Sequence, residues 1–346
     1  MKITVQTKSG QLEYECGQEE NLLYAGLRQG LALPYECATG TCGTCRARVL
    51  TGQAEIEWPD APGLSYVKQE KNEVLMCRAR ALGDCTLRVP SKVERMNGEL
   101  APGYRRGTIE NIDMLTHDVA SFNVAVDGPI TFDAGQFVVL ETPEVKGGRA
   151  YSMVNYSRGT DSLSFVVKRK PEGKFSDWLF DGRVEGKKVN VYGPLGRATF
   201  HPEDGKNVLC IAGGSGVAGM MSIIAKGCEE SYFVDHKGYL FFGIRTAGDV
   251  FFMEDLAGFV SRFPDNLEIT VALSDENVSD DLRGRYPNIN FTSGFVHAVT
   301  SERMAGQYDN VVAFVAGPPP MVDGTLRMLV LEARLPGTDI RYDKFS

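Results

Sequence analysis

Residues 37–45 read CATGTCGTC, and this stretch places three cysteines, Cys37, Cys42 and Cys45, at the spacing C-x4-C-x2-C. A fourth cysteine, Cys77, follows further along the chain in the sequence LMCR. This is the spacing of plant-type [2Fe–2S] centres, in which four thiolates hold two irons. Because a tight loop can deliver three of the four ligands, the stretch predicts an iron–sulfur site within a small α+β domain.

The loop also contains Gly40 and Gly43, which permit the positive φ angles and the close backbone approach that a cluster demands. A structural zinc site or simple buried thiols are the alternatives. Zinc usually takes two C-x2-C-like pairs and this chain has one, while a Rieske centre needs two histidines that are absent near the loop. The other cysteines have no partner at a useful spacing and are interpreted as small buried hydrophobic residues: Cys16, Cys85, Cys210 and Cys228.

The composition is that of a globular protein with several domains. The 346 residues correspond to two or three domains, and 37 basic against 45 acidic residues give a net charge of −8 without a basic patch. We therefore expect no nucleic-acid partner. No apolar run approaches the length of about 20 residues that a membrane-spanning helix needs. Residues 1–5 hold no apolar signal core, so we expect a cytoplasmic protein whose cysteines are thiols or ligands.

Turn residues and apolar periodicity divide the chain into three domains. We expect an α+β domain over residues 1–95 and a polar, turn-rich linker over 96–103. Short strands separated by glycine and proline predict an antiparallel β-barrel over 104–203. Alternating strands and helices predict an α/β domain with a parallel sheet over 204–346.

The individual elements follow from the same patterns. The first domain is expected to contain strands at 2–7, 10–15 and 46–50 and a helix at 21–28. The clearest strands of the second are 119–126, 136–141, 162–168 and 187–192, and a short helix is expected at 175–181. The third is expected to contain strands at 207–212, 238–243, 267–273 and 311–316 and helices at 217–228 and 320–334.

Two short motifs indicate a flavin site. In Arg149-Ala150-Tyr151-Ser152 the arginine can clamp a pyrophosphate, the tyrosine can lie along the flavin, and the serine can donate to flavin N5, which accepts hydride. Gly173-Lys174-Phe175-Ser176 then opens a short helix whose free N–H groups suit a phosphate. An exposed strand and an ordinary turn with a serine cap are the alternatives for each motif alone, but the pair favours FAD.

Two further loops follow buried strands and predict a dinucleotide crevice. Gly213-Gly214-Ser215-Gly216 begins one helix, and Gly317-Pro318 precedes another, for which a rigid helix start is the alternative. The acidic residue that the ordinary Rossmann fingerprint requires is missing, because Arg245 follows the second strand. Arg245 can grip a 2′-phosphate, whereas Asp249 nearby would repel one.

Together these motifs resemble those of the ferredoxin–NADP reductase superfamily with an N-terminal plant-type ferredoxin domain. The greatest similarity is to the NADH-dependent reductase components of soluble diiron monooxygenases of the toluene, alkene, phenol and methane type. The resemblance covers nearly the whole chain and extends to Trp58–Gly63 and Tyr342–Phe345. It implies a β-grasp ferredoxin domain, a β-barrel that binds FAD and an α/β domain that binds NAD.

The same resemblance implies roles for individual residues. The expected cluster ligands are Cys37, Cys42, Cys45 and Cys77, and the expected FAD contacts are Arg149, Tyr151, Ser152, Lys174 and Ser176. The loops at Gly213 and Pro318 would bind NADH, and Phe345 would cover the flavin face. Three positions depart from the pattern: Gly219 stands where many relatives have proline, Ala316 where many have cysteine, and Ser346 follows the terminal aromatic residue.

The implied function is the transfer of hydride from NADH to FAD and of single electrons through the cluster to an oxygenase component. We expect a monomer that docks transiently. The alternatives are the reductase of a Rieske dioxygenase or a P450 system, a self-contained flavin reductase, and a non-enzymatic iron–sulfur carrier. No acid–base pair is needed, and the four histidines are interpreted as surface or packing residues. Glu36, Glu55 and Glu57 either help docking or form a solvated face.

Overall fold

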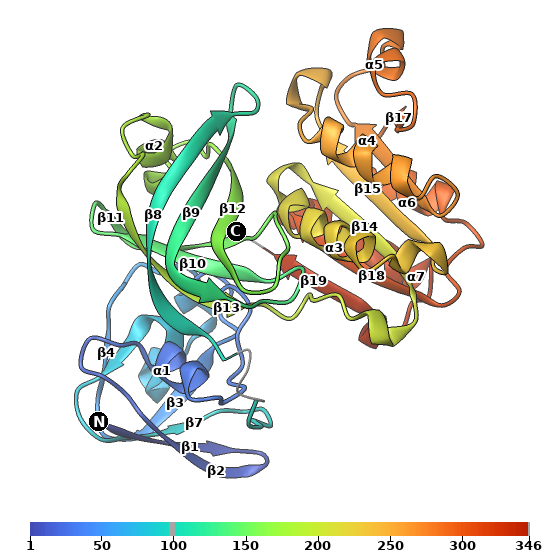
Figure 1. Cartoon of the computed structure of the whole chain (residues 1–346). Coiled ribbons are helices and arrows are strands. Elements are labelled where there is room, and N and C mark those ends of the chain that lie inside the picture. The colour runs from blue at the N-terminus through green and yellow to red at the C-terminus, as the bar shows by residue number, and fades with distance from the viewer. Residues whose placement is uncertain (97–100, 345–346) are drawn as a thin grey trace.

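Three large sheets, one for each expected domain, organise the computed structural model, which describes residues 1–96 and 101–344 (Figure 1). Within these ranges no helix is both long and apolar enough to cross a membrane. The limits of the domains stay predictions, and residues 97–100 of the expected linker lie outside the described ranges.

The first sheet has the order β2-β1-β7-β3-β5 and carries one helix, α1. Its elements are β1 (Lys2–Thr7), β2 (Gly10–Glu15), α1 (Leu22–Arg28), β3 (Arg46–Thr51), β5 (Glu73–Leu75) and β7 (Cys85–Arg88), and β4 (Ala54–Ile56) pairs separately with β6 (Ala79–Ala81). Asn21 begins α1 because its side-chain oxygen accepts a hydrogen bond of 2.8 Å from the backbone N–H of Tyr24. The expected hairpin, helix and third strand are confirmed.

The second sheet has the order β11-β10-β13-β8-β9-β12, and all neighbouring strands are antiparallel. Its elements are β8 (Gly103–Met114), β9 (Val119–Ile130), β10 (Phe137–Thr142), β11 (Val145–Ser152), β12 (Thr160–Lys168), α2 (Lys174–Phe180) and β13 (Lys188–Leu195). Phe175 and Leu179 of α2 are buried in the core of this sheet. The antiparallel architecture that the short strands predict is confirmed.

The third sheet is parallel throughout, in the order β17-β16-β15-β14-β18-β19. Its strands are β14 (Asn207–Gly213), β15 (Gly238–Ile244), β16 (Leu267–Leu273), β17 (Asn290–Ser293), β18 (Val311–Gly317) and β19 (Ile340–Lys344). Its helices are α3 (Val217–Glu229), α4 (Met253–Arg262), α5 (Asp280–Arg285), α6 (Val296–Arg303) and α7 (Pro319–Leu331). Separate apolar cores lie on the two faces, as a doubly wound sheet requires.

The helix expected at 320–334 is shorter than its apolar pattern suggests. It ends at Leu331, and Arg334 adopts a positive φ of 55° just before Pro336. A left-handed residue and a following proline both stop a helix, so the last turn of the expected helix does not form.

Aromatic stacking joins the first sheet to the second. The rings of Tyr24 in α1 and Tyr192 in β13 lie 3.9 Å apart and nearly parallel, and both side chains are buried. The Tyr192 hydroxyl donates to the Tyr24 carbonyl at 2.8 Å, and the Tyr24 hydroxyl donates to the carbonyl of Ala38 in the cysteine loop at 3.0 Å. Phe137 and Val139 of β10 belong to the same apolar core as the first domain. The two domains therefore pack as one unit.

Replacing Tyr192 should weaken this unit. We expect Tyr192→Ala to lower the free energy of unfolding by about 3 kcal/mol, because it removes a buried ring from a packed interface. Tyr192→Phe should cost about 1 kcal/mol, because it removes only the hydrogen bond to Tyr24. Urea unfolding followed by the fluorescence of Trp58 and Trp178, one in each domain, measures both. Equal stability of the two variants and the wild type would contradict this packing.

Candidate functional site

The four cysteines at the predicted cluster site come together as two pairs. Cys45 and Cys77 are buried with their Sγ atoms 3.2 Å apart, and the Cys42 thiol hydrogen-bonds to Cys37. Two irons with two thiolates each is the ligand set of a [2Fe–2S] centre. The donor chemistry therefore fits this cluster, although the role of each cysteine stays a prediction.

Backbone conformation shapes the loop around the thiols. Gly40 and Gly43 have φ angles of +91° and +79°, as the sequence predicts, and Ala38 is also left-handed at +56°. Gly63 N donates to Gly40 O at 2.9 Å, and a Cβ atom on Gly63 would lie 2.8 Å from that oxygen and 3.0 Å from the backbone nitrogen of Gly43. Gly63 therefore supports the loop at a distance that no other residue allows.

Hydrogen bonds to sulfur favour a thiolate in this loop. The Cys42 thiol and the backbone N–H groups of Thr39 and Thr41, both 3.4 Å from Cys37 Sγ, lower the pKa of Cys37 to about 4. The backbone N–H of Thr44 donates in the same way to Cys42 Sγ at 3.5 Å. Metals bind the thiolate, so Cys37 is the cysteine that these contacts favour as a ligand, whereas a neighbouring thiol and burial raise the pKa of Cys42 and of Cys77.

The last described strand, β19, comes close to the cysteine loop. Burial and the nearby carboxylate of Glu36, the neighbour of Cys37, raise the pKa of Asp343 to about 7. Phe345, two positions beyond Asp343, lies outside the described residues, so its place over the flavin stays a prediction.

The predicted flavin residues gather where β11 meets α2. The rings of Tyr151 and Phe175 lie 5.2 Å apart, and Ser152 is buried. Arg149 is partly buried, and burial lowers its pKa. The Ser152 Oγ atom lies 3.7 Å from the position that a Cβ on Gly219 would occupy, so this strand faces the first turn of α3.

The start of α2 has the geometry of a local turn. The Lys170 backbone N–H donates to Ser176 Oγ at 3.1 Å, and that hydroxyl donates to the carbonyl of Gly173 at 2.9 Å. A Cβ on Gly173 would lie 2.5 Å from Ser176 Oγ, so the turn requires glycine here. The structure thus contains the turn with a bonded serine that is one of the two interpretations of Gly173–Ser176. Phosphate binding by Lys174 and its neighbours stays a prediction.

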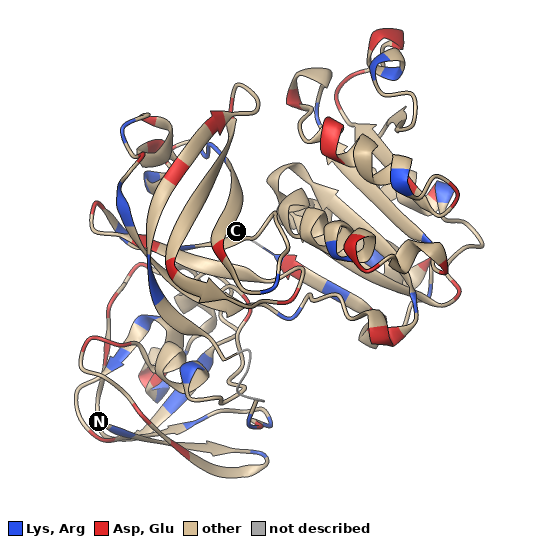
Figure 2. Cartoon of the chain, viewed as in Figure 1, with Lys and Arg blue, Asp and Glu red and all other residues tan. Residues whose placement is uncertain are grey.

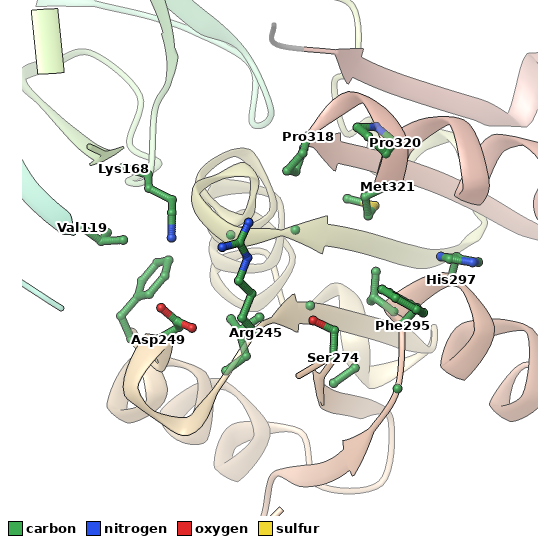
Figure 3. A pocket seen from close by; sticks show the side chains of 18 residues that line it. Val119, Lys168, Arg245, Asp249, Ser274, Phe295, His297, Pro318, Pro320 and Met321 are labelled. Atoms are coloured by element: carbon green, nitrogen blue, oxygen red, sulfur yellow. The ribbon is translucent and has the colours of Figure 1, made fainter. Parts of the chain in front are cut away.

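A pocket of about 550 Å³ lies between the second and third domains, at the carboxyl ends of the parallel strands (Figure 3). Four residues predicted for the nucleotide site line it: Gly213, Gly214, Arg245 and Pro318. Ser215, Gly216 and Gly317 are not among the lining residues. A Cβ on Gly216 would lie 2.5 Å from Ala316 O, and one on Gly317 would lie 3.0 Å from Gly213 N. These two glycines let the loops touch.

Several residues that line this pocket belong to no motif recognised in the sequence. Lys168, at the end of β12, reaches into the pocket from the barrel side, and Phe295, His297 and Met321 line its far side (Figure 3). Phe295 is 65% exposed, which suits contact with a planar ring. His297 therefore belongs to a candidate binding site, whereas the sequence reading treated it as a surface or packing residue.

Charges from two domains meet at the mouth of this pocket. Lys168 Nζ lies 2.8 Å from Asp118 Oδ2. Burial would raise the pKa of Asp118, but the ion pair with Lys168 outweighs burial, so the pKa of this carboxyl is lowered. Asp249 accepts hydrogen bonds from the backbone N–H and the hydroxyl of Thr246 at 3.0 and 2.9 Å. Asp249 is thus fixed by its own turn and lines the same pocket as Arg245.

Comparison with known proteins covers all three domains. Residues 4–82 match the 2Fe-2S iron-sulfur cluster binding domain, 106–200 the oxidoreductase FAD-binding domain and 210–327 the oxidoreductase NAD-binding domain. The chain is 36% identical to ferredoxin--NAD(P)(+) reductase CarAd of Metapseudomonas resinovorans, over 97% of this chain and 98% of CarAd. It is 29% identical to the ferredoxin--NAD(+) reductase component of the alkene monooxygenase system of Xanthobacter autotrophicus, over 96% of this chain and 97% of that protein. The solved structure of a ferredoxin reductase in carbazole 1,9a-dioxygenase superposes on this chain with a TM-score of 0.85 and 33% sequence identity. The match covers 100% of this chain and 99% of the solved chain.

Gly63 gives a test of the cysteine loop. We expect Gly63→Ala to lower the iron and sulfide content per chain and to speed the loss of cluster absorbance in chelator, because a methyl group would push on the loop backbone at a cost of about 1–3 kcal/mol. Gly83→Ala in the same domain is the control, since a Cβ there meets nothing within 4 Å. Identical cluster content in both variants would refute the support role of Gly63.

Proposed function

This chain belongs to the ferredoxin–NAD(P)(+) reductases in which a [2Fe–2S] domain precedes FAD- and NAD-binding domains, and we propose that it carries electrons from NADH to an oxygenase system. The convergence of the three sites is the observation that carries this proposal. Ser152 of the flavin strand faces α3, which follows the nucleotide loop, while α1 connects the cysteine loop to the barrel. Electrons can then pass between neighbouring sites within one chain.

The residues of the chain would divide the work by position. NADH provides electrons in pairs and an iron–sulfur cluster takes them singly, and bound FAD supplies the chemistry that links the two. In our proposal Arg149 and the start of α2 hold the FAD phosphates, Ser152 donates a hydrogen bond toward N5, and Tyr151 lies along the flavin. Lys168, Arg245 and the glycine loops hold the nucleotide, and the four thiolates hold the cluster.

The competing functions each leave one site without a use. A self-contained flavin reductase would not need two pairs of thiols in a loop with sulfur-directed N–H groups. An iron–sulfur carrier without enzymatic activity would not need the pocket between the second and third domains.

The acceptor, we propose, docks transiently against the open side of the cysteine loop, on a cytoplasmic monomer. Cys42 is only partly buried, and Tyr66 beside Gly43 is 62% exposed. Basic and acidic residues are interspersed over the first domain (Figure 2). Glu55 and Glu57 form ion pairs with Arg80 at 3.2 and 3.1 Å, so Glu36 is the freer of the three glutamates that the sequence singled out for docking.

The class of oxygenase is a narrower question. We propose a diiron monooxygenase, which the alkene monooxygenase relative supports. The dioxygenase alternative has support of its own, because the carbazole 1,9a-dioxygenase reductase is similar over the full length of the chain. Reduction rates with purified acceptors of both systems would separate the two.

Cys77→Ser tests the order of the sites. We expect the variant to keep NADH-driven reduction of a small dye, which takes electrons from flavin, and to lose most reduction of cytochrome c, because the cluster lacks one ligand. Stopped-flow and steady-state rates of the two reactions, with iron, sulfide and flavin assayed for each protein, provide the measurement. Cys210→Ser, at a buried cysteine far from the loop, is the control. If the Cys77 variant reduces cytochrome c at the wild-type rate, the cluster is not on the path.

Asp249 tests the choice of nucleotide. We expect kcat/KM to be higher for NADH than for NADPH, because the Asp249 carboxylate repels a 2′-phosphate near Arg245. Asp249→Asn should lower the ratio of kcat/KM for NADH to kcat/KM for NADPH roughly tenfold, which corresponds to about 1.4 kcal/mol. Asp255→Asn, on the exposed side of α4, should leave the ratio unchanged. A wild-type preference for NADPH would refute this choice.

A further inference from the structure

Arg78, the residue after the cluster cysteine Cys77, is a buried cation that braces the cysteine loop. Its side chain is 7% exposed, and its Nε and one terminal nitrogen both donate to the Thr39 carbonyl, at 3.0 and 2.8 Å. The guanidinium also lies over the ring of Trp58, 5.6 Å from the ring centre. Arg78 is thus held firmly from the side of the first domain.

The same guanidinium reaches the flavin strand of the second domain. A Cβ on Gly147 in β11 would lie 3.8 and 3.9 Å from the two terminal nitrogens of Arg78, and 3.6 Å from a terminal nitrogen of Arg149. Two arginines from different domains therefore converge on one glycine. Arg149 points to this place from the strand that holds Tyr151 and Ser152.

The two arginines carry more positive charge than the one carboxyl coupled to them, Glu141, can offset. Neither arginine takes part in an ion pair of 4 Å or less within residues 1–96 and 101–344, and Arg149 donates to the carbonyl of its own neighbour, Gly148. Glu141 of β10 places its Oε1 3.0 Å from the position of a Cβ on Gly148; burial raises the pKa of this carboxyl and Arg78 lowers it. Arg78 is buried and Arg149 partly buried. Burial and the nearby Arg78 lower the pKa of Arg149, and an anion of two charges would relieve the repulsion between the two cations.

We propose that Arg78 is the second guanidinium of the FAD phosphate site, so that the cluster domain itself contributes a contact to the flavin cofactor. The proposal rests on the proposed function, since it requires that Arg149 and β11 bind FAD. A pyrophosphate presents two negative charges and planar oxygen pairs that suit guanidinium forks. Because Arg78 also holds Thr39, binding of FAD would order the cysteine loop, and an intact loop would strengthen FAD binding.

The test compares a flavin with phosphates to one without. Arg78→Gln should weaken FAD binding to the flavin-depleted protein at least tenfold, because a charge-assisted contact is lost, whereas riboflavin binding should stay within twofold. Fluorescence titration with FAD and with riboflavin gives both constants. Arg80→Gln is the matched control, because Arg80 lies two residues away and pairs with Glu19, Glu55 and Glu57 at the surface. The control should bind both flavins as the wild type does.

A second readout follows the coupling to the cluster. In flavin-depleted wild type, addition of FAD should change the visible circular dichroism of the cluster, and Arg78→Gln should abolish that change. Arg78→Lys keeps the charge but lacks the planar guanidinium, so its change in circular dichroism on addition of FAD should be smaller than that of the wild type and larger than that of Arg78→Gln. If Arg78→Gln does not retain the cluster, the FAD and riboflavin constants of Arg78→Lys decide.

Two results would overturn the proposal. Unchanged FAD affinity in both Arg78 variants would show that the side chain does not touch the phosphates. Equal losses for FAD and riboflavin would show that Arg78 only supports the fold. In either case wild-type FAD binding and the Cys77→Ser result stand unaffected. Failure of the wild type to bind FAD at all would instead refute the proposed function.

Discussion

The stack of Tyr24 on Tyr192 is the contact on which the relation between the first two domains depends. Through its hydroxyl Tyr24 touches the cysteine loop at Ala38, and through its carbonyl it accepts a hydrogen bond from the barrel. One residue thus joins the candidate cluster to the candidate flavin domain. Electron transfer needs short and constant distances, and a buried aromatic interface with directed hydrogen bonds provides them. The apolar core that continues across this interface makes independent motion of the two domains costly.

The junction between the second and third domains is an apolar core that lies close to the two glycine loops. Phe200 of the second domain packs against Tyr232 and Phe314 of the third, and Gly216 and Gly317 allow two loops of the third domain to touch. A Cβ atom at Gly216 or Gly317 would push these two loops apart. Charged residues then border the resulting pocket, with Lys168 from one domain and Arg245 from the other. Buried apolar side chains therefore join both pairs of domains, and at the second junction a pocket of about 550 Å³ remains open beside the glycine loops.

Local patterns carried much of the prediction. The cysteine spacing, the two flavin motifs and the glycine loops are short stretches whose chemistry depends on neighbours in the chain, and the structure brings them to adjacent places. Strand alternation and buried apolar strands likewise indicated antiparallel and parallel sheets, because each pattern reflects how many faces of a strand are covered. The end of α7 was missed, since its apolar periodicity continues past Leu331 while Arg334 and Pro336 stop the helix.

The sequence by itself determined the architectures of the three domains, the four thiols and the two glycine loops proposed to hold a nucleotide, because these follow from spacing and periodicity along the chain. Only the tertiary structure decided that Lys168 enters the pocket, that Glu55 and Glu57 pair with Arg80, and that Arg78 meets Arg149 at Gly147. The physical reason is distance along the chain. Contacts between residues that are far apart in sequence depend on how whole sheets pack, and no local pattern encodes that packing.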